Sequence, residues 1–201
     1  LIEINNWKSS NVYNNQFNIS INRNTRTGSF LEHIGSWGEI QDGSYWIITS
    51  INDTVFFNAG SELIIADFTD PSNPVVLGQT SLPGIPHWGT IELRDDYLYV
   101  ANGSSGFAIY DVSDLSNPYQ LGLFQYNNGR AYQFVLVGDT AYVASRQAGL
   151  IILDISDPSN PSEIASYEST NHIDAVAVLD SNYIAIGDRD DKITFLDVTD
   201  F

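Results

Sequence analysis

The sequence contains pairs of aspartates three residues apart, whose carboxylates could bind a metal ion or accept hydrogen bonds. They recur as Asp67 with Asp70, Asp111 with Asp114, and Asp154 with Asp157. Two carboxylates ahead of a turn could ligate calcium, but an aspartate at a strand end could equally accept hydrogen bonds from the backbone N–H groups of that turn. We favour the turn interpretation, because a metal site usually occurs once and no copy carries the ligand series of an EF-hand.

A denser acidic segment, GDRDD at residues 187–191, could hold a cation in a different way. Its carboxylates, Asp188, Asp190 and Asp191, could ligate one calcium ion together with backbone carbonyls. The alternative is a solvated hairpin tip that contains an internal aspartate–arginine pair. We expect no cofactor for the chain, and calcium at this turn is the alternative.

Histidine, arginine and aromatic residues recur about 24 residues before the repeated aspartates. Gly43, His87 and Arg130 occupy that position, His172 lies one residue away from it, and Trp88, Tyr132 and Asp174 are next to them. The residues differ between copies, so the repeat itself does not require them. Such side chains on loops at one rim of a scaffold suit an anionic or sugar-like ligand. The alternative is that Trp88 and Tyr132 pack between sheets while the histidines cap loops.

The same rim is the basis for a catalytic interpretation. His87 and His172 could act as general bases, with Asp174 or Glu92 orienting them. The sequence contains no cysteine nucleophile, G-x-S-x-G elbow, H-E-x-x-H pair, P-loop or dinucleotide-binding glycine pattern. We therefore expect a non-catalytic role in binding, adhesion or surface assembly. An enzyme acting on a carbohydrate or small anionic substrate at the rim is the alternative.

Short β-strands are the elements that must position these residues. The repeat around Asp111 reads GTIELRDD, YLYVANG, FAIYDVSD and NPYQLGLFQY, four runs rich in β-branched and aromatic residues that turn-forming residues separate. Four antiparallel strands in about 40–45 residues are typical of one propeller blade. The sequence therefore predicts an all-β protein, a β-propeller built from four-stranded antiparallel blades.

Five copies of this unit follow one another, over approximately residues 1–42, 43–86, 87–129, 130–172 and 173–201. The first is degraded, with Asn22 in the place of the aspartate, and the last contains Asp197 but lacks its outer strand. We expect one propeller domain over residues 1–201, or a piece of a larger propeller whose open strand is covered from outside these residues. A five-bladed ring with a three-stranded final blade is the alternative.

The repeated motif, LIIAD, FAIYD, LIILD and ITFLD with a following S/T-D-P-S-N-P turn, resembles the LVIVD-repeat family. The resemblance covers nearly the whole chain and is weak over residues 1–45. It implies a β-propeller in a secreted or cell-surface protein. It transfers no catalytic residue to this sequence.

The composition narrows the choice of partners. The net charge is −17, from 25 acidic and 8 basic residues, and the basic stripe of a nucleic-acid-binding protein is absent. The same charge disfavours an anionic membrane surface, and no apolar run has the length of a membrane span. We expect other protein chains or the rest of a longer polypeptide as partners, with a glycan as a further candidate. The sequons at Asn18, Asn52 and Asn102 are glycosylation candidates if the protein is secreted.

Overall fold

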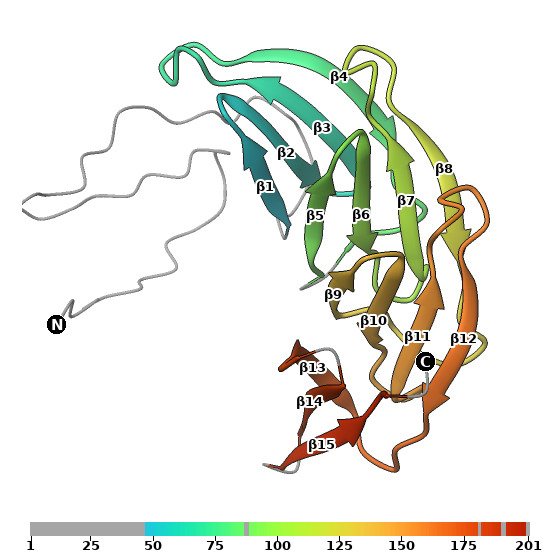
Figure 1. The fold of residues 1–201 in the computed structure, drawn as a ribbon. Helices are drawn as coiled ribbons and strands as arrows, with labels where there is room; N and C mark the ends of the chain where they lie inside the picture. Colours follow the sequence, from blue (N-terminus) through green and yellow to red (C-terminus); the bar gives the residue numbers. More distant parts are fainter. Residues whose placement is uncertain (1–46, 87–88, 181, 190–191, 200–201) are drawn as a thin grey trace, which may run out of the picture.

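The computed structural model describes residues 47–86, 89–180, 182–189 and 192–199. Within these ranges the chain forms four antiparallel sheets and no helix (Figure 1). The repeat predicted over residues 1–42 lies outside the described residues.

Each sheet is a meander whose strands pair in the order of the sequence. The first contains β1 (Ile48–Ile51), β2 (Thr54–Ala59), β3 (Glu62–Asp67) and β4 (Val75–Ser81). The second contains β5 (Ile91–Arg94), β6 (Tyr97–Ala101), β7 (Phe107–Asp111) and β8 (Tyr119–Phe124). The third contains β9 (Gln133–Val137), β10 (Thr140–Ala144), β11 (Leu150–Asp154) and β12 (Ser162–Tyr167). The fourth contains β13 (Ile173–Val178), β14 (Tyr183–Asp188) and β15 (Ile193–Asp197).

Two-residue turns join the first and second strands of the first three sheets. Asn52, Asp95 and Gly138 open these turns with φ angles of 52°, 55° and 53°. Tight hairpins need a positive φ at this position, and asparagine, aspartate and glycine are the residues that adopt it most readily. The predicted repeat of short strands is therefore confirmed in the described part of the chain, with the repeated aspartates ending β3, β7, β11 and β15.

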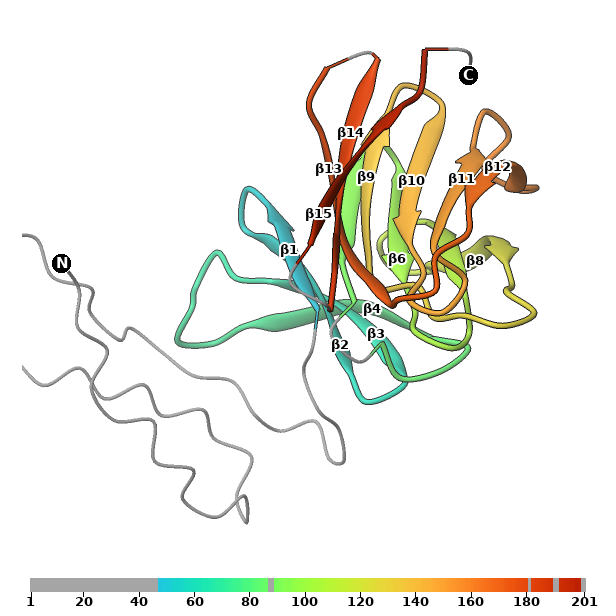
Figure 2. The same cartoon turned by 90° about the horizontal axis from the view of Figure 1, so that it is seen from below.

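The four sheets lie along an arc (Figure 1). Their first strands are on the concave side, where β1 contacts β5 and β9 contacts β13, and the fourth strands β4, β8 and β12 are on the convex side. Seen from below in Figure 2, the sheets follow one another as separate layers. The arc of described residues is open between the first and fourth sheets, so they do not form a closed ring.

The hydrophobic core lies between neighbouring sheets. In β11, Leu150 and Ile152 pack against the fourth sheet, whereas Ile151 and Leu153 pack against the second. Successive side chains of a strand point to opposite faces, so both faces of this strand are buried. The burial on two sides explains why the repeated motif is apolar at consecutive positions instead of alternating with polar residues.

The repeated aspartates hold the turns that follow the third strands. Asp111 Oδ1 accepts hydrogen bonds from the N–H and the hydroxyl of Ser113 at 3.0 and 2.6 Å, and Asp114 Oδ1 accepts the same pair from Ser116 at 3.0 and 2.7 Å. Equivalent N–H bonds form at Asp67, Asp70, Asp154, Asp157 and Asp197. The predicted role of these carboxylates as turn acceptors is confirmed.

These turns also pack closely against the fourth strand of the preceding sheet. A Cβ added to Gly122 in β8 would lie 2.1 Å from the carbonyl oxygen of Pro158, and one added to Gly78 in β4 would lie 2.0 Å from that of Leu115. The strand register shifts next to each of these glycines, which marks a β-bulge. Glycine is required at both positions because the turn of the next repeat occupies the space of a side chain.

Candidate functional site

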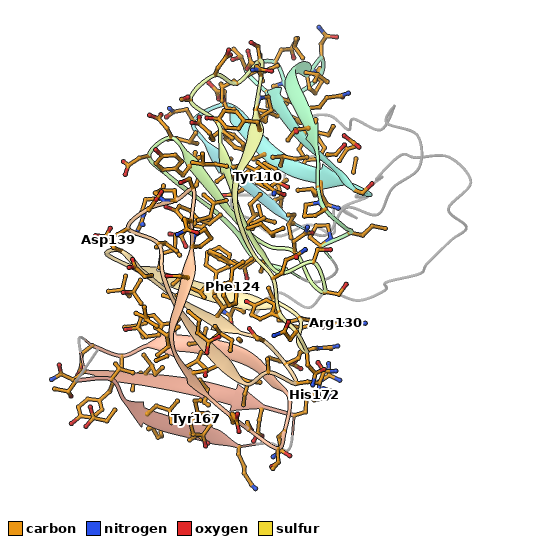
Figure 3. The ribbon with its side chains drawn as sticks, turned by 90° about the vertical axis from the view of Figure 1, so that its right-hand side faces the viewer. Tyr110, Phe124, Arg130, Asp139, Tyr167 and His172 are labelled. Carbon is orange, nitrogen blue, oxygen red and sulfur yellow. The ribbon has the colours of Figure 1, made fainter. Side chains whose placement is uncertain are left out.

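The loops that enter the first strands and the turns that join second to third strands meet at one end of the sheets, which we call the rim. Arg130 and His172 lie on this rim, and Asp139 lies at the opposite end of the molecule (Figure 3). Backbone hydrogen bonds interlock the rim segments of neighbouring sheets. Arg146 and Ile173 exchange N–H···O bonds of 2.9 and 3.2 Å, which places the β10–β11 turn against the start of β13.

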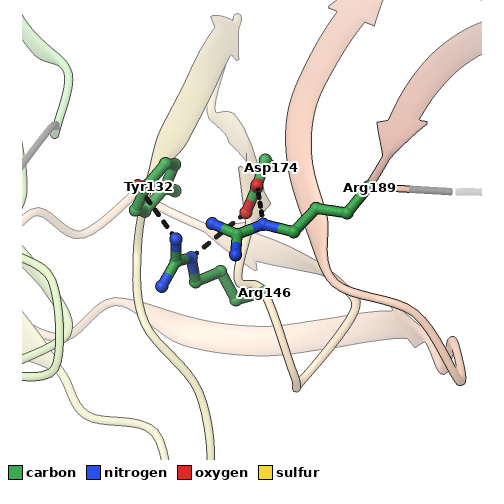
Figure 4. A network of polar contacts seen from close by, with 4 residues as sticks. All are labelled: Tyr132, Arg146, Asp174 and Arg189. Carbon is green, nitrogen blue, oxygen red and sulfur yellow. Dashed lines mark hydrogen bonds and ion pairs between the residues drawn. The ribbon is translucent and has the colours of Figure 1, made fainter. Parts of the chain in front are cut away.

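A network of four side chains spans this junction (Figure 4). Arg146 Nε donates to Asp174 Oδ1 at 3.1 Å, and a terminal nitrogen of the same guanidinium donates to the Tyr132 hydroxyl at 3.0 Å. The guanidinium carbon lies 4.3 Å from the centroid of the Tyr132 ring, which is cation–π distance. Arg146 thus joins the loop before β9 in the third sheet to the first residues of β13 in the fourth.

Arg189 binds the other oxygen of the same carboxylate. Its Nε donates to Asp174 Oδ2 at 2.6 Å, while its backbone N–H donates to the carbonyl of His172 at 3.3 Å. The side chain of Arg146 is 11% exposed, whereas that of Arg189 is 49% exposed. Two guanidiniums therefore share one carboxylate, and the network carries a net positive charge.

Arg146 has an unfavourable backbone conformation for a side chain of its kind. Its φ is +50°, and the residue at the same point of the preceding repeat is Gly103, with a φ of +57°. A residue with a Cβ in the left-handed region costs roughly 1 kcal/mol or more, a cost that glycine avoids. The arginine side chain is therefore present at a position where the backbone favours glycine.

The structure brings together part of the predicted rim site. Tyr132 and Asp174 meet through Arg146, and Arg130 lies close by, with its N–H donating to Ser145 O at 3.2 Å and its side chain exposed. His172 is half-buried, and its Nδ1 has no hydrogen-bond partner in the described part of the chain. His87 and Trp88 lie outside the described residues.

The sequence pattern does not single out two functional candidates that the structure shows, Arg146 and Arg189. Both stand eight residues before a repeated aspartate, Asp154 and Asp197 respectively. This shared position in the repeat is the sequence signal that could identify the two arginines as a pair. It lies in the turn after the second strand, however, and only the packing of neighbouring sheets shows that both side chains reach Asp174.

The acidic turn that follows β14 is described only in part. Asp188 Oδ2 accepts a hydrogen bond from the Asn171 side-chain amide and its Oδ1 accepts one from the Lys192 N–H, both at 3.2 Å. Asp190 and Asp191 lie outside the described residues. Elsewhere in the described ranges, no three histidine or acidic side chains are grouped closely enough to hold a metal ion. Calcium at this turn stays a prediction.

The three sequons have different surroundings. Asn52 is exposed in the β1–β2 turn, whereas Asn102 is 1% exposed and neither atom of its amide has a hydrogen-bond partner in the described region. Asn18 lies outside the described residues. In the folded chain a modifying enzyme could reach the side chain of Asn52, and the fold shields that of Asn102.

The charges of the described residues are unevenly distributed. Arg130, Arg146, Arg189 and Lys192 are at the rim, and the remaining described basic residue, Arg94, is in the β5–β6 hairpin at the other end. Most of the described aspartates are also at that other end, in the turns after the first and third strands. The rim is therefore the least acidic end of an acidic protein.

Comparison with known structures supports the fold. The computationally designed Ika4 protein aligns with a TM-score of 0.66 and 9% sequence identity, over 84% of this chain and 99% of its own. The computationally designed Ika8 protein aligns with a TM-score of 0.63 and 8% identity, over 77% of this chain and 46% of its own. At this level of identity the similarity concerns the fold alone. No curated protein matches the chain.

No helix in the described residues has the length and apolar character needed to cross a membrane.

The family model for the LVIVD repeat matches this sequence at residues 89–125 and 128–169. These two ranges contain the whole second and third sheets, in which FAIYD and LIILD form the buried third strands β7 and β11. On these repeats, the chain belongs to the LVIVD repeat family.

Proposed function

We propose that this chain is part of a β-propeller that acts as a non-catalytic assembly module, outside the cell or on its surface. The repeated four-stranded sheets, their order along an arc and the LVIVD repeats support the architecture. The whole chain forms one domain in this proposal, because each sheet buries its apolar faces only against its neighbours.

The observation that carries the proposal is an apolar face of the fourth sheet that no described residue covers. Ile193 and Phe195 in β15 are 70% and 66% exposed. Their equivalents in β11, Leu150 and Ile152, are 0% and 3% exposed because the next sheet covers them. Tyr183, 45% exposed, extends the patch on β14. Large exposed apolar patches on soluble proteins usually mark an interaction site.

The occupant we propose is a sheet of a second copy of this chain. Each of the three described inter-sheet hydrophobic cores lies between two neighbouring sheets of this chain. A sheet from a second copy therefore has the shape that packs against the equivalent face of the other sheets. In the first three sheets a fourth strand pairs with the third strand, but β15 pairs with β14 alone among the described residues. Its free backbone edge could add a strand from the neighbouring chain.

The test compares two identical substitutions at exposed strand positions. Ile193→Asp places a charge on the proposed contact face, and Ile164→Asp places one on β12, where Ile164 is 49% exposed. Sedimentation equilibrium over a range of concentrations should show self-association of the unaltered chain and of Ile164→Asp. For Ile193→Asp, the dissociation constant should rise about tenfold or more, because one buried isoleucine contributes roughly 1.5–3 kcal/mol.

Hydrogen exchange gives an independent reading of the same face. The β15 amides should become more protected as the protein concentration rises. An unaltered chain that stays monomeric at every concentration, with β15 amides already protected, would show that the face is covered within the chain. That result would overturn the assembly proposal and leave the propeller architecture in place.

A further inference from the structure

We infer that Arg146 and Arg189 form a binding site for a carboxylate group at the rim, and that Asp174 positions both guanidiniums. The inference concerns the loop end of the third and fourth sheets and is independent of assembly through the β15 face. It rests on hydrogen-bond donors that the network leaves free, on the local charge and on the backbone conformation of Arg146.

Free donors of both arginines remain after the network has formed. Arg189 uses its Nε for Asp174, and its two terminal nitrogens have no partner in the described part of the chain. Arg146 uses its Nε for Asp174 and one terminal nitrogen for Tyr132, which leaves the other terminal nitrogen. Guanidinium N–H groups in a plane match the two oxygens of a carboxylate and can bind it in bidentate fashion.

The local charge suits a ligand with one negative charge. Asp174 neutralises one of the two guanidiniums, so the network keeps the charge of the other. Arg130 adds a second positive group from the neighbouring loop. Asp188, at the end of β14, accepts hydrogen bonds from the Asn171 amide and the Lys192 N–H. The network therefore attracts an anion although the chain as a whole is strongly acidic.

Two further observations distinguish this network from an ordinary surface ion pair. Arg146 keeps its side chain at a left-handed position where the preceding repeat has Gly103, and backbone strain of this kind is concentrated at functional sites. Nearby, the Nδ1 atom of His172 is buried without a hydrogen-bond partner in the described region. A ligand seated beside the arginines would offer that nitrogen a partner.

The experiment uses D-galacturonate as the probe and D-galactose as its neutral control, because the two sugars differ in the carboxylate. Titration of the full chain, followed by the NMR signals of the arginine Nε–H groups, should show saturable shifts with galacturonate and none with galactose. Arg189→Gln should raise the dissociation constant about tenfold or more, the usual effect of losing a charge-assisted hydrogen bond. Equal binding of galactose, or tighter binding of inorganic phosphate, would overturn the carboxylate assignment.

Three further variants separate a positioned site from general attraction. Arg146→Gly introduces the residue found at this point in the preceding repeat and should weaken binding as much as Arg189→Gln. Arg94→Gln removes the same charge at the opposite end, where Arg94 donates to the Gly138 carbonyl, and should leave binding unchanged. Asp174→Asn should weaken binding although it makes the rim more positive. Tighter binding by Asp174→Asn, or an equal loss in Arg94→Gln, would overturn the proposal.

Discussion

A single methyl group placed on Gly122 should separate two neighbouring sheets. In Gly122→Ala the new Cβ would lie 2.1 Å from the Pro158 carbonyl oxygen and 2.9 Å from Pro161 Cδ, whereas ordinary contacts start at 3.4 Å. The turn would have to retreat by roughly 1 Å, in a range where overpacking of a well-packed site costs about 1–3 kcal/mol. We expect a value near 3 kcal/mol, because the obstacle is backbone rather than a flexible side chain.

The turn that opposes Gly122 has little freedom to move. Asp157 Oδ1 accepts hydrogen bonds from the N–H and the hydroxyl of Ser159 at 3.0 and 2.6 Å, and the Asn160 N–H donates to the Asp157 carbonyl at 3.0 Å. A displacement of the Pro158 carbonyl would strain these bonds. A local shift of one peptide therefore cannot relieve the clash. The substitution instead weakens the packing of the second sheet against the third.

Urea unfolding of the variant and of a matched control measures the effect. Gly187→Ala is the control, since its Cβ would meet the Ala175 Cβ at an ordinary 3.5 Å. Both substitutions reduce the freedom of the unfolded chain equally, so the difference between them isolates the clash. Gly122→Ala should lower the midpoint by about 1 M urea or more, and Gly187→Ala should stay within about 0.5 kcal/mol of the unaltered chain. Equal midpoints for the two variants would refute the close packing of the Pro158 turn against β8.

Three other outcomes test the turns, one buried amide and the acidic segment. The hydroxyl and N–H donors of Ser113 and Ser116 hold the pKa of Asp111 and Asp114 below the ordinary value. The stability that these two carboxylates add is therefore complete above about pH 4, and it is lost as the pH falls through the lowered pKa. The thermal midpoint should therefore drop on acidification below that pH, and less so in Asp111→Asn; equal slopes for the two proteins would contradict the acceptor role. Asn102→Ser should stabilise the chain by about 1 kcal/mol in urea unfolding, because the equivalent Ser145 hydroxyl donates to the Val143 carbonyl at 3.2 Å while both amide atoms of Asn102 lack a partner in the described region. EDTA should leave the thermal midpoint nearly unchanged, because protein N–H groups already occupy the turn aspartates; a drop of many degrees that Asp188→Asn abolishes would instead assign calcium to the acidic turn.

The pattern of apolar residues and turn formers was sufficient to predict the strands. FAIYD and LIILD are β-branched, aromatic and apolar at successive positions, and they form strands buried on both faces. The aspartates and serines after them act within a few residues of chain, so their hydrogen bonds could also be predicted from the sequence. Such interactions are local, and they recur in each copy of the repeat.

The rim site could be predicted only in part. Tyr132 and Asp174 stand out because they break the repeat, and the structure places both in the same network. Arg146 and Arg189 could not be predicted, because their partner Asp174 lies 28 and 15 residues away, in another sheet or on another strand. Asn102 shows the same limit, since its sequon reads as an accessible turn and its burial depends on the neighbouring loops.

The repeat, the four-strand meander and the turn chemistry follow from the sequence alone, because they depend on side chains within one repeat. The tertiary structure decided which turn fills the space beside Gly122, which carboxylate joins Arg146 to Arg189, and which face of the fourth sheet stays exposed. These features depend on how one sheet is seated on the next. That seating is set by the packing of side chains from distant parts of the chain, and the spacing of residues along the sequence does not record it.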